Sequence, residues 1–325
     1  MIGAIIGDIV GSRWEFNPTN DYDFKWLSCD NDFTDDTICT IAVADALLHD
    51  SNDFGKYIHE WCRKYPYPTG GYGGRFAQWV HSDNPQPYNS FGNGAAMRVS
   101  PVAHWFDKEA QVLEAAKATA LPTHNHPEGI KGAQTVALAI FKALVYNRAS
   151  YQDAPMHIDE ILQACVEFSG YDINMPKSSV MNKFDETCQG TVPVALKIIS
   201  MAANFEDAIR MAVSLGADAD TLGAIVGSIA EAIWGIPFEM RMDFKYLLPE
   251  DMHRVLIDFR HKRPRSFKPL IDTCYAGNVF SNVSWDVFYD LEGEEAYNEE
   301  IKRVEDRNEQ RRKMMKERAK ARENW

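Results

Sequence analysis

Helical spacing of apolar residues is the feature that most constrains the fold of this chain. Between about Thr34 and Leu270, apolar side chains recur every three or four residues, as in the stripe from Ile38 to Leu47. Residues 133–145 are apolar almost all round, which is typical of the central helix of a large bundle. Runs of β-branched residues bounded by hairpin turns are scarce. These patterns predict an all-α helical body without internal repeats, and 325 residues suffice for one large domain or two small ones.

The segment from residue 291 onward differs from the rest because it is rich in charged residues and has almost no apolar stripe. We expect one domain over residues 1–290 and a charged helical tail over residues 291–325. Charge runs of this kind are usually solvated faces, and we interpret the tail as one. Contact of its basic half with an acidic partner is the alternative. We expect a long loop over residues 151–186, and no pattern there indicates a role.

Charge and the first residues of the chain argue against two classes of partner. The sequence has 47 acidic and 34 basic residues and a formal net charge of −13. Nucleic-acid binding needs a clustered excess of Lys and Arg, so we expect no nucleic acid as a general partner. Residues 1–16 lack the basic start of a signal peptide, and Asp8 interrupts their apolar run. We therefore expect a cytoplasmic protein that does not associate with membranes.

The cysteines indicate neither a disulfide framework nor a zinc site. The six of them lie far apart in the sequence and form no C-x-x-C pair. We interpret them as reduced thiols that behave mostly as small buried hydrophobic residues.

Two acidic motifs stand at expected helix starts, one near each end of the helical region. Singly, Thr and Asp at such positions are ordinary caps of a first turn, favoured by the helix dipole. Because the arrangement occurs twice, we consider its oxygens as metal ligands. The candidates are Thr34, Asp35, Asp36, Asp218, Asp220 and Thr221.

The charge of the four aspartates favours two cations. Carboxylates that converge without a counter-charge repel one another and raise their own pKa values, whereas two divalent ions would neutralise them. Ligation by oxygen alone suits Mg²⁺ or Mn²⁺ better than Zn²⁺. Gly223 and Gly227 stand one turn apart behind the second motif. They would let that helix pack closely against a neighbour and bring the two acidic helix starts together.

Three loops between the helical segments are unusually rich in Gly, Pro and Asn. They cover residues 66–74, 89–94 and 122–129. Such composition permits unusual backbone geometry and close approach to a ligand. Ordinary turn chemistry is the alternative for any one loop taken alone.

These motifs together resemble the ADP-ribosylglycohydrolase family, the family of the dinitrogenase reductase-activating glycohydrolase. The resemblance rests on six segments in the family's order, over roughly residues 1–265. They are Gly7–Glu15, Phe33–Thr37, Tyr72–Gly74, Ser90–Arg98, Thr123–Pro127 and Gly216–Ala224. The resemblance implies an all-α fold, as a compact single-domain helical bundle, and a binuclear Mg²⁺ or Mn²⁺ centre that grips the ribose hydroxyls of an ADP-ribosyl group. It also makes residues 1–290 the catalytic domain.

By matched position, the resemblance assigns the six candidate oxygens above as the metal ligands. Glu15 matches the family's mobile acidic residue, which would position or deprotonate the attacking water, with Asp35 and Asp36 as further catalytic residues. The role of Asp8 stays open between support of a ligand and support of the loop that carries Glu15.

The resemblance also assigns residues that would hold the nucleotide. Backbone amides of Tyr72, Gly73 and Gly74 would bind the pyrophosphate. A second phosphate and adenosine loop comprises Ser90, Phe91, Gly92 and Asn93, in which Phe91 would stack on adenine. His124 would contact the ligand. We interpret His126 as a structural neighbour; a metal-binding H-x-H pair is the alternative.

The expected function is hydrolysis of the N- or O-glycosidic bond between ADP-ribose and an acceptor. The substrate would be an ADP-ribosylated protein or an ADP-ribosyl small molecule, and we expect a monomer. Two alternatives stay open: a metal-dependent nucleotide phosphoesterase, and an ADP-ribose-binding protein without turnover.

Overall fold

A computed structural model describes residues 1–149, 153–237, 240–241, 244 and 247–262, and the single positions 313, 317, 320 and 325. This part of the chain is helical, and the prediction of an all-α fold is confirmed. Within it, β-type pairing is limited to an isolated bridge between Gly92 and Thr187. The α-helices are α1 (Ile2–Ser12), α2 (Asp35–Leu48), α3 (Phe54–Lys64), α4 (Gly74–His81), α5 (Gly94–Met97), α6 (Ser100–Trp105), α7 (Glu109–Ala120), α8 (Pro127–Ala149), α9 (Ile158–Ser169), α10 (Cys188–Met201), α11 (Phe205–Val213), α12 (Ala219–Trp234) and α14 (Glu250–Lys262).

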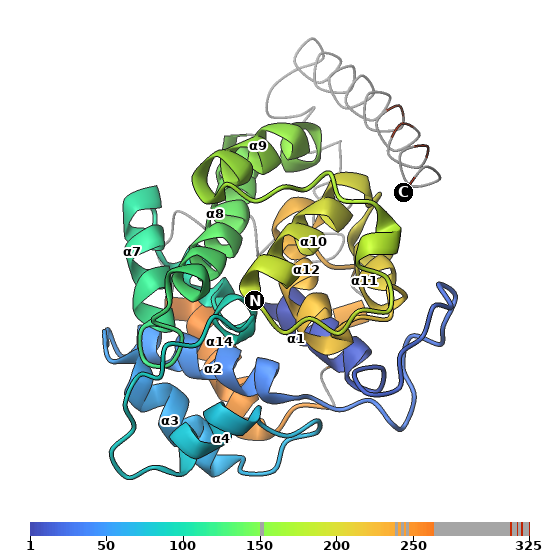
Figure 1. Ribbon diagram of the computed structural model, residues 1–325. Coiled ribbons are helices and arrows are strands. Elements are labelled where there is room, and N and C mark those ends of the chain that lie inside the picture. The colour runs from blue at the N-terminus through green and yellow to red at the C-terminus, as the bar shows by residue number, and fades with distance from the viewer. Residues whose placement is uncertain are drawn as a thin grey trace, which may run out of the picture.

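Helices α8 and α12 form the middle of the bundle. α8 contacts α5, α6, α7, α9, α10 and α12, while α12 also packs on α1 and α11 (Figure 1). The nearly all-round apolar stretch predicted for a central helix lies on α8, where residues such as Ala133, Ala139 and Ile140 are fully buried. A helix surrounded on most sides has no face for polar residues, which explains this pattern.

Close packing of α1 on α12 fixes the geometry that the site depends on. A Cβ built on Gly7 would lie 1.9 Å from the carbonyl oxygen of Gly223, and one on Gly3 would lie 2.2 Å from that of Gly227. A larger residue at these positions would force the two backbones apart. Close packing at Gly223 and Gly227 is therefore confirmed, and its partner is α1, an apolar helix outside the range in which the sequence predicted helices.

The loop between α1 and α2 is tied back onto α1. The side chain of Asn31 donates to the carbonyl oxygen of Ile9 over 2.7 Å. Arg13 donates to Ser28 Oγ over 2.6 Å and to the carbonyl oxygen of Lys25 over 2.9 Å. These bonds hold the segment that carries Glu15 beside the end of α1.

Two sequence predictions concern segments away from the bundle centre. The expectation of a long loop over residues 151–186 is wrong, because α9 lies within it and buries Ile158, Ile161 and Cys165 at helical spacing. The domain boundary at residue 290 and the charged tail over 291–325 lie outside the described residues, apart from the single positions above. Cys274 lies outside them as well.

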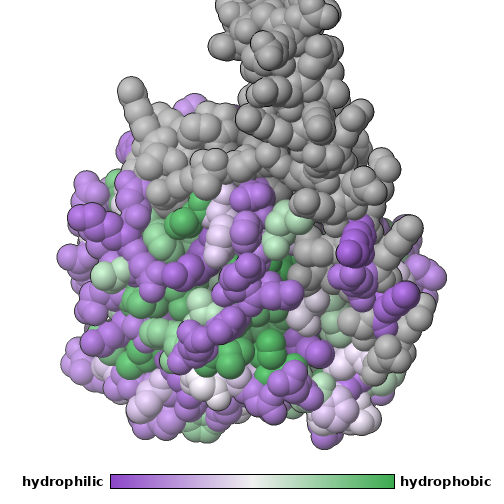
Figure 2. Space-filling model, turned by 90° about the horizontal axis from the view of Figure 1, so that it is seen from above, coloured by the Kyte–Doolittle hydropathy of each residue, from purple (hydrophilic) through white to green (hydrophobic). Residues whose placement is uncertain are grey.

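The surface and the thiols agree with the composition. On the face drawn in Figure 2, hydrophilic side chains surround scattered hydrophobic ones. Of the cysteines in the described part, Cys29 is exposed and the others are buried, and all of these are free thiols. Among the described helices we find no segment with the length and hydropathy that crossing a bilayer requires.

Candidate functional site

Asp8 joins α1 to the start of α2. Its carboxylate is fully buried and accepts hydrogen bonds from Thr34 N at 3.1 Å, Thr34 Oγ1 at 2.8 Å and Thr37 N at 3.1 Å, and from the Thr37 hydroxyl. Burial raises the pKa of Asp8 to about 6, and these hydrogen bonds oppose the rise. Thr34 is itself the N-cap of α2 and accepts from Asp36 N. Hydrogen bonds to Asp8 on α1 therefore fix the first turn of α2.

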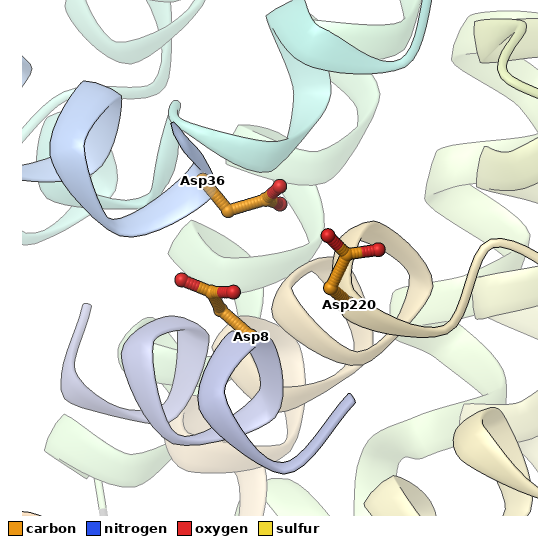
Figure 3. A group of neighbouring side chains, drawn as sticks. All are labelled: Asp8, Asp36 and Asp220. Atoms are coloured by element: carbon orange, nitrogen blue, oxygen red, sulfur yellow. The ribbon is translucent and has the colours of Figure 1, made fainter. Parts of the chain in front are cut away.

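Two groups of acidic side chains converge among the described residues. In the first, which we name the inner group, oxygens of Asp8, Asp36 and Asp220 lie within 4.8 Å of one another. Figure 3 shows their carboxylates pointing toward each other from α1, α2 and α12. In the second, the outer group, oxygens of Glu15, Asp218 and Asp220 meet the same limit. Asp220 belongs to both groups, so the two are contiguous.

The predicted ligands divide between buried and open positions. Asp36 points into the inner group, and Thr221 Oγ1 donates to its Oδ2 over 3.1 Å, which links the starts of α12 and α2. Thr34 is fully buried at its capping position. Asp35 belongs to neither group and lies half-buried on the wall of the adjoining cavity. Adjacent helical residues point about 100° apart, which accounts for the different surroundings of Asp35 and Asp36.

Burial raises the pKa of every carboxyl of these groups, and repulsion by acidic neighbours adds to it at all of them except Asp8. Loss of water raises the pKa of Asp218 to about 7 and that of Glu15 to about 9, and neighbouring carboxylates add to both shifts. Asp36 and Asp220 have pKa values well above the usual range, first through burial and then through their acidic neighbours. The same two causes raise the pKa of Asp35 to about 8.

The donor set fits hard divalent cations. Asp36 Oδ1, Asp220 Oδ1 and Glu15 Oε2 are buried and accept no hydrogen bond within the described structure. Buried acceptors without partners are rare in proteins, and cation binding is one of the roles that explain them. All the donors are carboxylate or hydroxyl oxygens, which Mg²⁺ and Mn²⁺ prefer. The inner and outer groups could therefore hold divalent cations. These cations would replace protons that the carboxyl groups otherwise keep because their pKa values are raised.

A cavity of about 510 Å³ opens beside the outer group. All eight residues predicted to bind the nucleotide line it: Tyr72, Gly73, Gly74, Ser90, Phe91, Gly92, Asn93 and His124. A Cβ added at Gly73 or Gly74 would meet nothing within 4 Å, so this backbone faces open space. Gly73 caps α4, whose first-turn amides have no partners within the helix. The first turn of α4 therefore lies at one wall of the cavity, where its unpaired amides would suit an anion.

Two of the cavity residues are already engaged by the protein. Asn93 is buried, and its amide donates to Asp218 Oδ2 over 2.7 Å and to Thr191 Oγ1 over 3.1 Å. It therefore orients a member of the outer group as well as lining the cavity. Phe91 is 43% exposed and packs edge-on against His126 with ring centroids 5.3 Å apart, which leaves ring surface open to a ligand.

His124 is neutral, and one of its ring nitrogens is engaged by the protein. Burial, with the nearby Arg98 charge, lowers the pKa of His124 well below its usual value. Thr123 Oγ1 accepts a hydrogen bond from Arg98 over 2.7 Å and lies 2.7 Å from His124 Nδ1. Nδ1 is therefore engaged within the protein, and Nε2 is the ring nitrogen left for a ligand. His124 thus offers a neutral ring to the cavity wall.

Sequence reasoning did not identify several residues of this site. It left the role of Asp8 open, and it did not single out Arg98, Phe16 or Glu186, all of which line the cavity. Arg98 stands within the Ser90–Arg98 motif, and its complete burial is unusual for an arginine. Phe16 and Glu186 occupy loops far apart in the chain, and neither has a local sequence signal.

The described fold is all-α and places the outer acidic group on the wall of a cavity. The model of the ADP-ribosylglycohydrolase family matches residues 1–263, so the chain belongs to this family, whose members act on glycosidic bonds. The predictions of this family and of a hydrolase are therefore confirmed.

Named relatives extend the comparison. ADP-ribosylarginine hydrolase Tri1 of Pseudomonas putida is 25% identical over 73% of this chain and 70% of that protein. ADP-ribosylhydrolase ARH3 of Danio rerio is 25% identical over 73% of this chain and 82% of that protein. The ADP-ribosyl-[dinitrogen reductase] glycohydrolase of Rhodospirillum rubrum is 24% identical over 73% and 84%. A solved ADP-ribosylglycohydrolase-related protein complex matches with a TM-score of 0.60 at 23% identity, covering 79% of this chain and 94% of that one, which supports the fold.

Proposed function

We propose that this chain hydrolyses the glycosidic bond between ADP-ribose and an acceptor, with an ADP-ribosylated protein side chain as the substrate. The observation that carries the proposal is one cavity with two chemically different walls. The outer acidic group lines one side and adjoins the inner group through Asp220. The Gly73–Gly74 turn, where a Cβ would meet nothing within 4 Å, lines another side. Such a cavity suits a ligand with a diol at one end and a pyrophosphate farther along.

The metal part of the proposal assigns Mg²⁺ or Mn²⁺ to the two acidic groups. Asp36, Asp218 and Asp220 would be direct ligands, and Asp8 would both ligate and hold the start of α2. The predicted hydroxyl ligands are Thr34 and Thr221. Asp35 would join from the cavity wall. The unpartnered buried oxygens of Asp36 and Asp220 support this assignment.

The nucleotide part uses the remaining walls. The first-turn amides of α4 and the amides of Tyr72, Gly73 and Gly74 would bind the pyrophosphate. The exposed ring of Phe91 would stack on adenine. His124 would contact the ligand through Nε2, since its Nδ1 is engaged by Thr123.

In the proposed reaction, water attacks the anomeric carbon of the ribose while the bond to the acceptor breaks, through an oxocarbenium-like transition state. Bound cations would lower the pKa of the water and hold the ribose diol in a fixed orientation. Glu15 is suited to accept the proton of the water because its Oε2 is buried, lacks a hydrogen-bond partner and adjoins the cavity. Asp35, on the same wall, is the second candidate for this role.

The names of the relatives support this reading. Tri1 of Pseudomonas putida is called an ADP-ribosylarginine hydrolase, and the Rhodospirillum rubrum protein is named for ADP-ribosyl-dinitrogen reductase. The first name gives an amino-acid acceptor and the second a protein.

The test is release of free ADP-ribose from arginine-linked and serine-linked ADP-ribosyl peptides in Mg²⁺, Mn²⁺ or EDTA. We expect metal-dependent release that an Asp35→Ala/Asp36→Ala double variant lacks. Appearance of AMP or inorganic phosphate instead would support a phosphoesterase. Tight binding of ADP-ribose without any turnover would support a binding protein.

A further inference from the structure

A buried arginine, Arg98, forms part of the cavity wall. It follows α5 directly, is 1% exposed and is the largest fully buried side chain among the described residues. Arginines are almost never fully buried unless they are paired, yet Arg98 forms no ion pair with a carboxylate in the described part of the chain. Burial of an unpaired charge is costly, which indicates that Arg98 serves the groups to which it donates.

One nitrogen of Arg98 makes both of its hydrogen bonds. Nη2 donates to the carbonyl oxygen of Thr119 over 3.0 Å and to Thr123 Oγ1 over 2.7 Å. Thr119 lies in the last turn of α7 and Thr123 just beyond it, and both are fully buried. Thr123 Oγ1 in turn lies 2.7 Å from His124 Nδ1. Arg98, Thr123 and His124 therefore form a continuous hydrogen-bonded chain from the end of α5 to the cavity wall.

The other edge of the His124 ring faces the loop of residues 89–94. A Cβ added at Gly94 would lie 3.2 Å from His124 Nε2, and one added at Gly92 would lie 3.4 Å from it. Both glycines line the cavity, and Nε2 forms no hydrogen bond within the described residues. Rotation of a histidine ring about its Cβ–Cγ bond has only broad preferences of its own. The contact of Nδ1 with Thr123 therefore decides which edge of the ring meets the cavity.

We propose that Arg98 is a positioning residue, which orients the Thr123 hydroxyl so that Thr123 holds the His124 ring with Nε2 toward the bound nucleotide. The inference rests on the proposed function, in which His124 contacts ADP-ribose, and adds two residues that act through it. A hydroxyl has one hydrogen and two lone pairs. Arg98 uses one lone pair of Thr123 Oγ1, so the hydrogen and the second lone pair remain for Nδ1, whichever tautomer the ring adopts.

The charge of Arg98 supports the same role. After burial, it is the second cause that lowers the pKa of His124 well below its usual value. The ring therefore stays neutral beside the buried guanidinium. The other side chain that stacks near it is Tyr88, with ring centroids 6.3 Å apart. Among the contacts of the ring, the bond to Thr123 is thus the one that fixes its orientation.

A double-mutant cycle on ADP-ribose binding, measured by calorimetry in saturating Mg²⁺, tests this chain of contacts. We expect Thr123→Val, which removes the hydroxyl, to weaken binding about fivefold, as loss of one hydrogen bond predicts. Arg98→Lys keeps the charge but has a shorter reach, and we expect a similar loss. In a His124→Ala background each substitution should change the affinity by less than about twofold, because the residue through which it acts is absent. Thr123→Ser should recover most of the affinity.

Thr119→Val is the matched control. Thr119 is as deeply buried as Thr123, but it contacts Arg98 through its carbonyl oxygen, and its hydroxyl donates to the carbonyl oxygen of Ala116. The control should lose stability without loss of ADP-ribose affinity. Nitrogen NMR of the histidine rings gives a second measure. The Nδ1 resonance of His124, assigned with His124→Ala, should move in Thr123→Val and Arg98→Lys and stay in Thr119→Val.

Distinct outcomes separate this inference from the proposed function. Unchanged affinity in Thr123→Val, equal losses with and without His124, or an Nδ1 resonance that ignores both substitutions would overturn the positioning role and leave the hydrolase standing. If Thr123→Val does not fold, the cycle of Arg98→Lys with His124→Ala decides. Absence of ADP-ribose binding by the wild-type protein would reject the proposed function, and this inference with it.

Discussion

The two acidic helix starts look alike in sequence but are held in different ways. The start of α2 is capped by Thr34 and clamped by Asp8, so hydrogen bonds of the protein itself fix it. The start of α12 has no side-chain cap, and Asp220 carries a buried oxygen without a partner. Both starts carry a buried carboxylate oxygen without a partner, on Asp36 and on Asp220, but only the start of α2 is also fixed by a side-chain cap and by the carboxylate of Asp8. The comparison teaches that similar motifs can divide structural and binding duties.

The largest effect should follow loss of Asp220, which both acidic groups share. We expect Asp220→Ala to reduce turnover by about 10³-fold or more, because it removes a ligand from each group. Steady-state release of ADP-ribose at saturating Mn²⁺ measures this. A variant with wild-type turnover would show that α12 does not hold the reacting centre.

The close packing of α1 on α12, on which the approach of the two acidic helix starts depends, should be nearly as sensitive to substitution. Gly7→Ala would place a Cβ 1.9 Å from the Gly223 carbonyl oxygen, and we expect a loss of about 3 kcal/mol by overpacking. Thermal unfolding should show a fall in Tm of roughly 6–12 °C for that loss. Gly73→Ala is the matched control, since its Cβ meets nothing within 4 Å. The control should keep its Tm and bind ADP-ribose more weakly; equal Tm values for the two variants would contradict the packing account.

The clamp on α2 can be tested on neighbouring threonines of one helix. Thr37 donates its hydroxyl to Asp8, whereas the buried Thr40 hydroxyl has no partner. Thr37→Val should destabilise the protein by about 1–3 kcal/mol, with or without metal, because the carboxylate loses a donor. Thr40→Val should be neutral or stabilising. Chemical denaturation in EDTA measures both, and a reversed order would remove Asp8 from its anchoring role.

The smallest expected effect is the pH dependence of the metal-free protein. The folded-state pKa values of Asp218, about 7, and Asp35, about 8, exceed the unfolded value of 3.8. Folded chains therefore hold more protons between the unfolded and folded pKa values, and stability must fall as pH rises across that interval. We expect Tm in EDTA to decrease as pH rises from the unfolded value of 3.8 to about 8, and saturating Mg²⁺ to offset the decrease.

Asp220→Asn should flatten that pH dependence and stabilise the metal-free protein by at least about 1 kcal/mol, because it removes a buried ionisable group. Destabilisation in EDTA would instead place Asp220 in a structural role like that of Asp8. The comparison of the two helix starts would then fail.

The sequence predicted the fold more completely than the site. Helical spacing over α2, α8 and α10 and the scarcity of strand signals sufficed for an all-α bundle. The glycines of α12 predicted close packing, but their partner α1 is apolar on nearly all sides and gives no amphipathic signal. Because the sequence did not predict α1 as a helix, it could not predict that Asp8 binds Thr34 and Thr37.

Part of the cavity wall was beyond sequence reasoning for a different reason. Phe16 lines the cavity and meets Phe184 only through tertiary packing of two loops, and an exposed aromatic residue in a loop carries no periodic signal. Likewise, nothing local distinguishes Glu186 from other surface acids. The assignments of metal and substrate residues remain predictions, which the convergence of the oxygens supports.

The most direct test of the central claim is the number of Mn²⁺ ions bound per chain, by isothermal titration calorimetry with atomic absorption as a second measure. The account predicts two ions for the wild-type protein and loss of both in Asp220→Ala, since that residue joins the inner and outer groups. One ion per chain, or two ions retained by Asp220→Ala, would contradict a binuclear centre shared between the starts of α2 and α12.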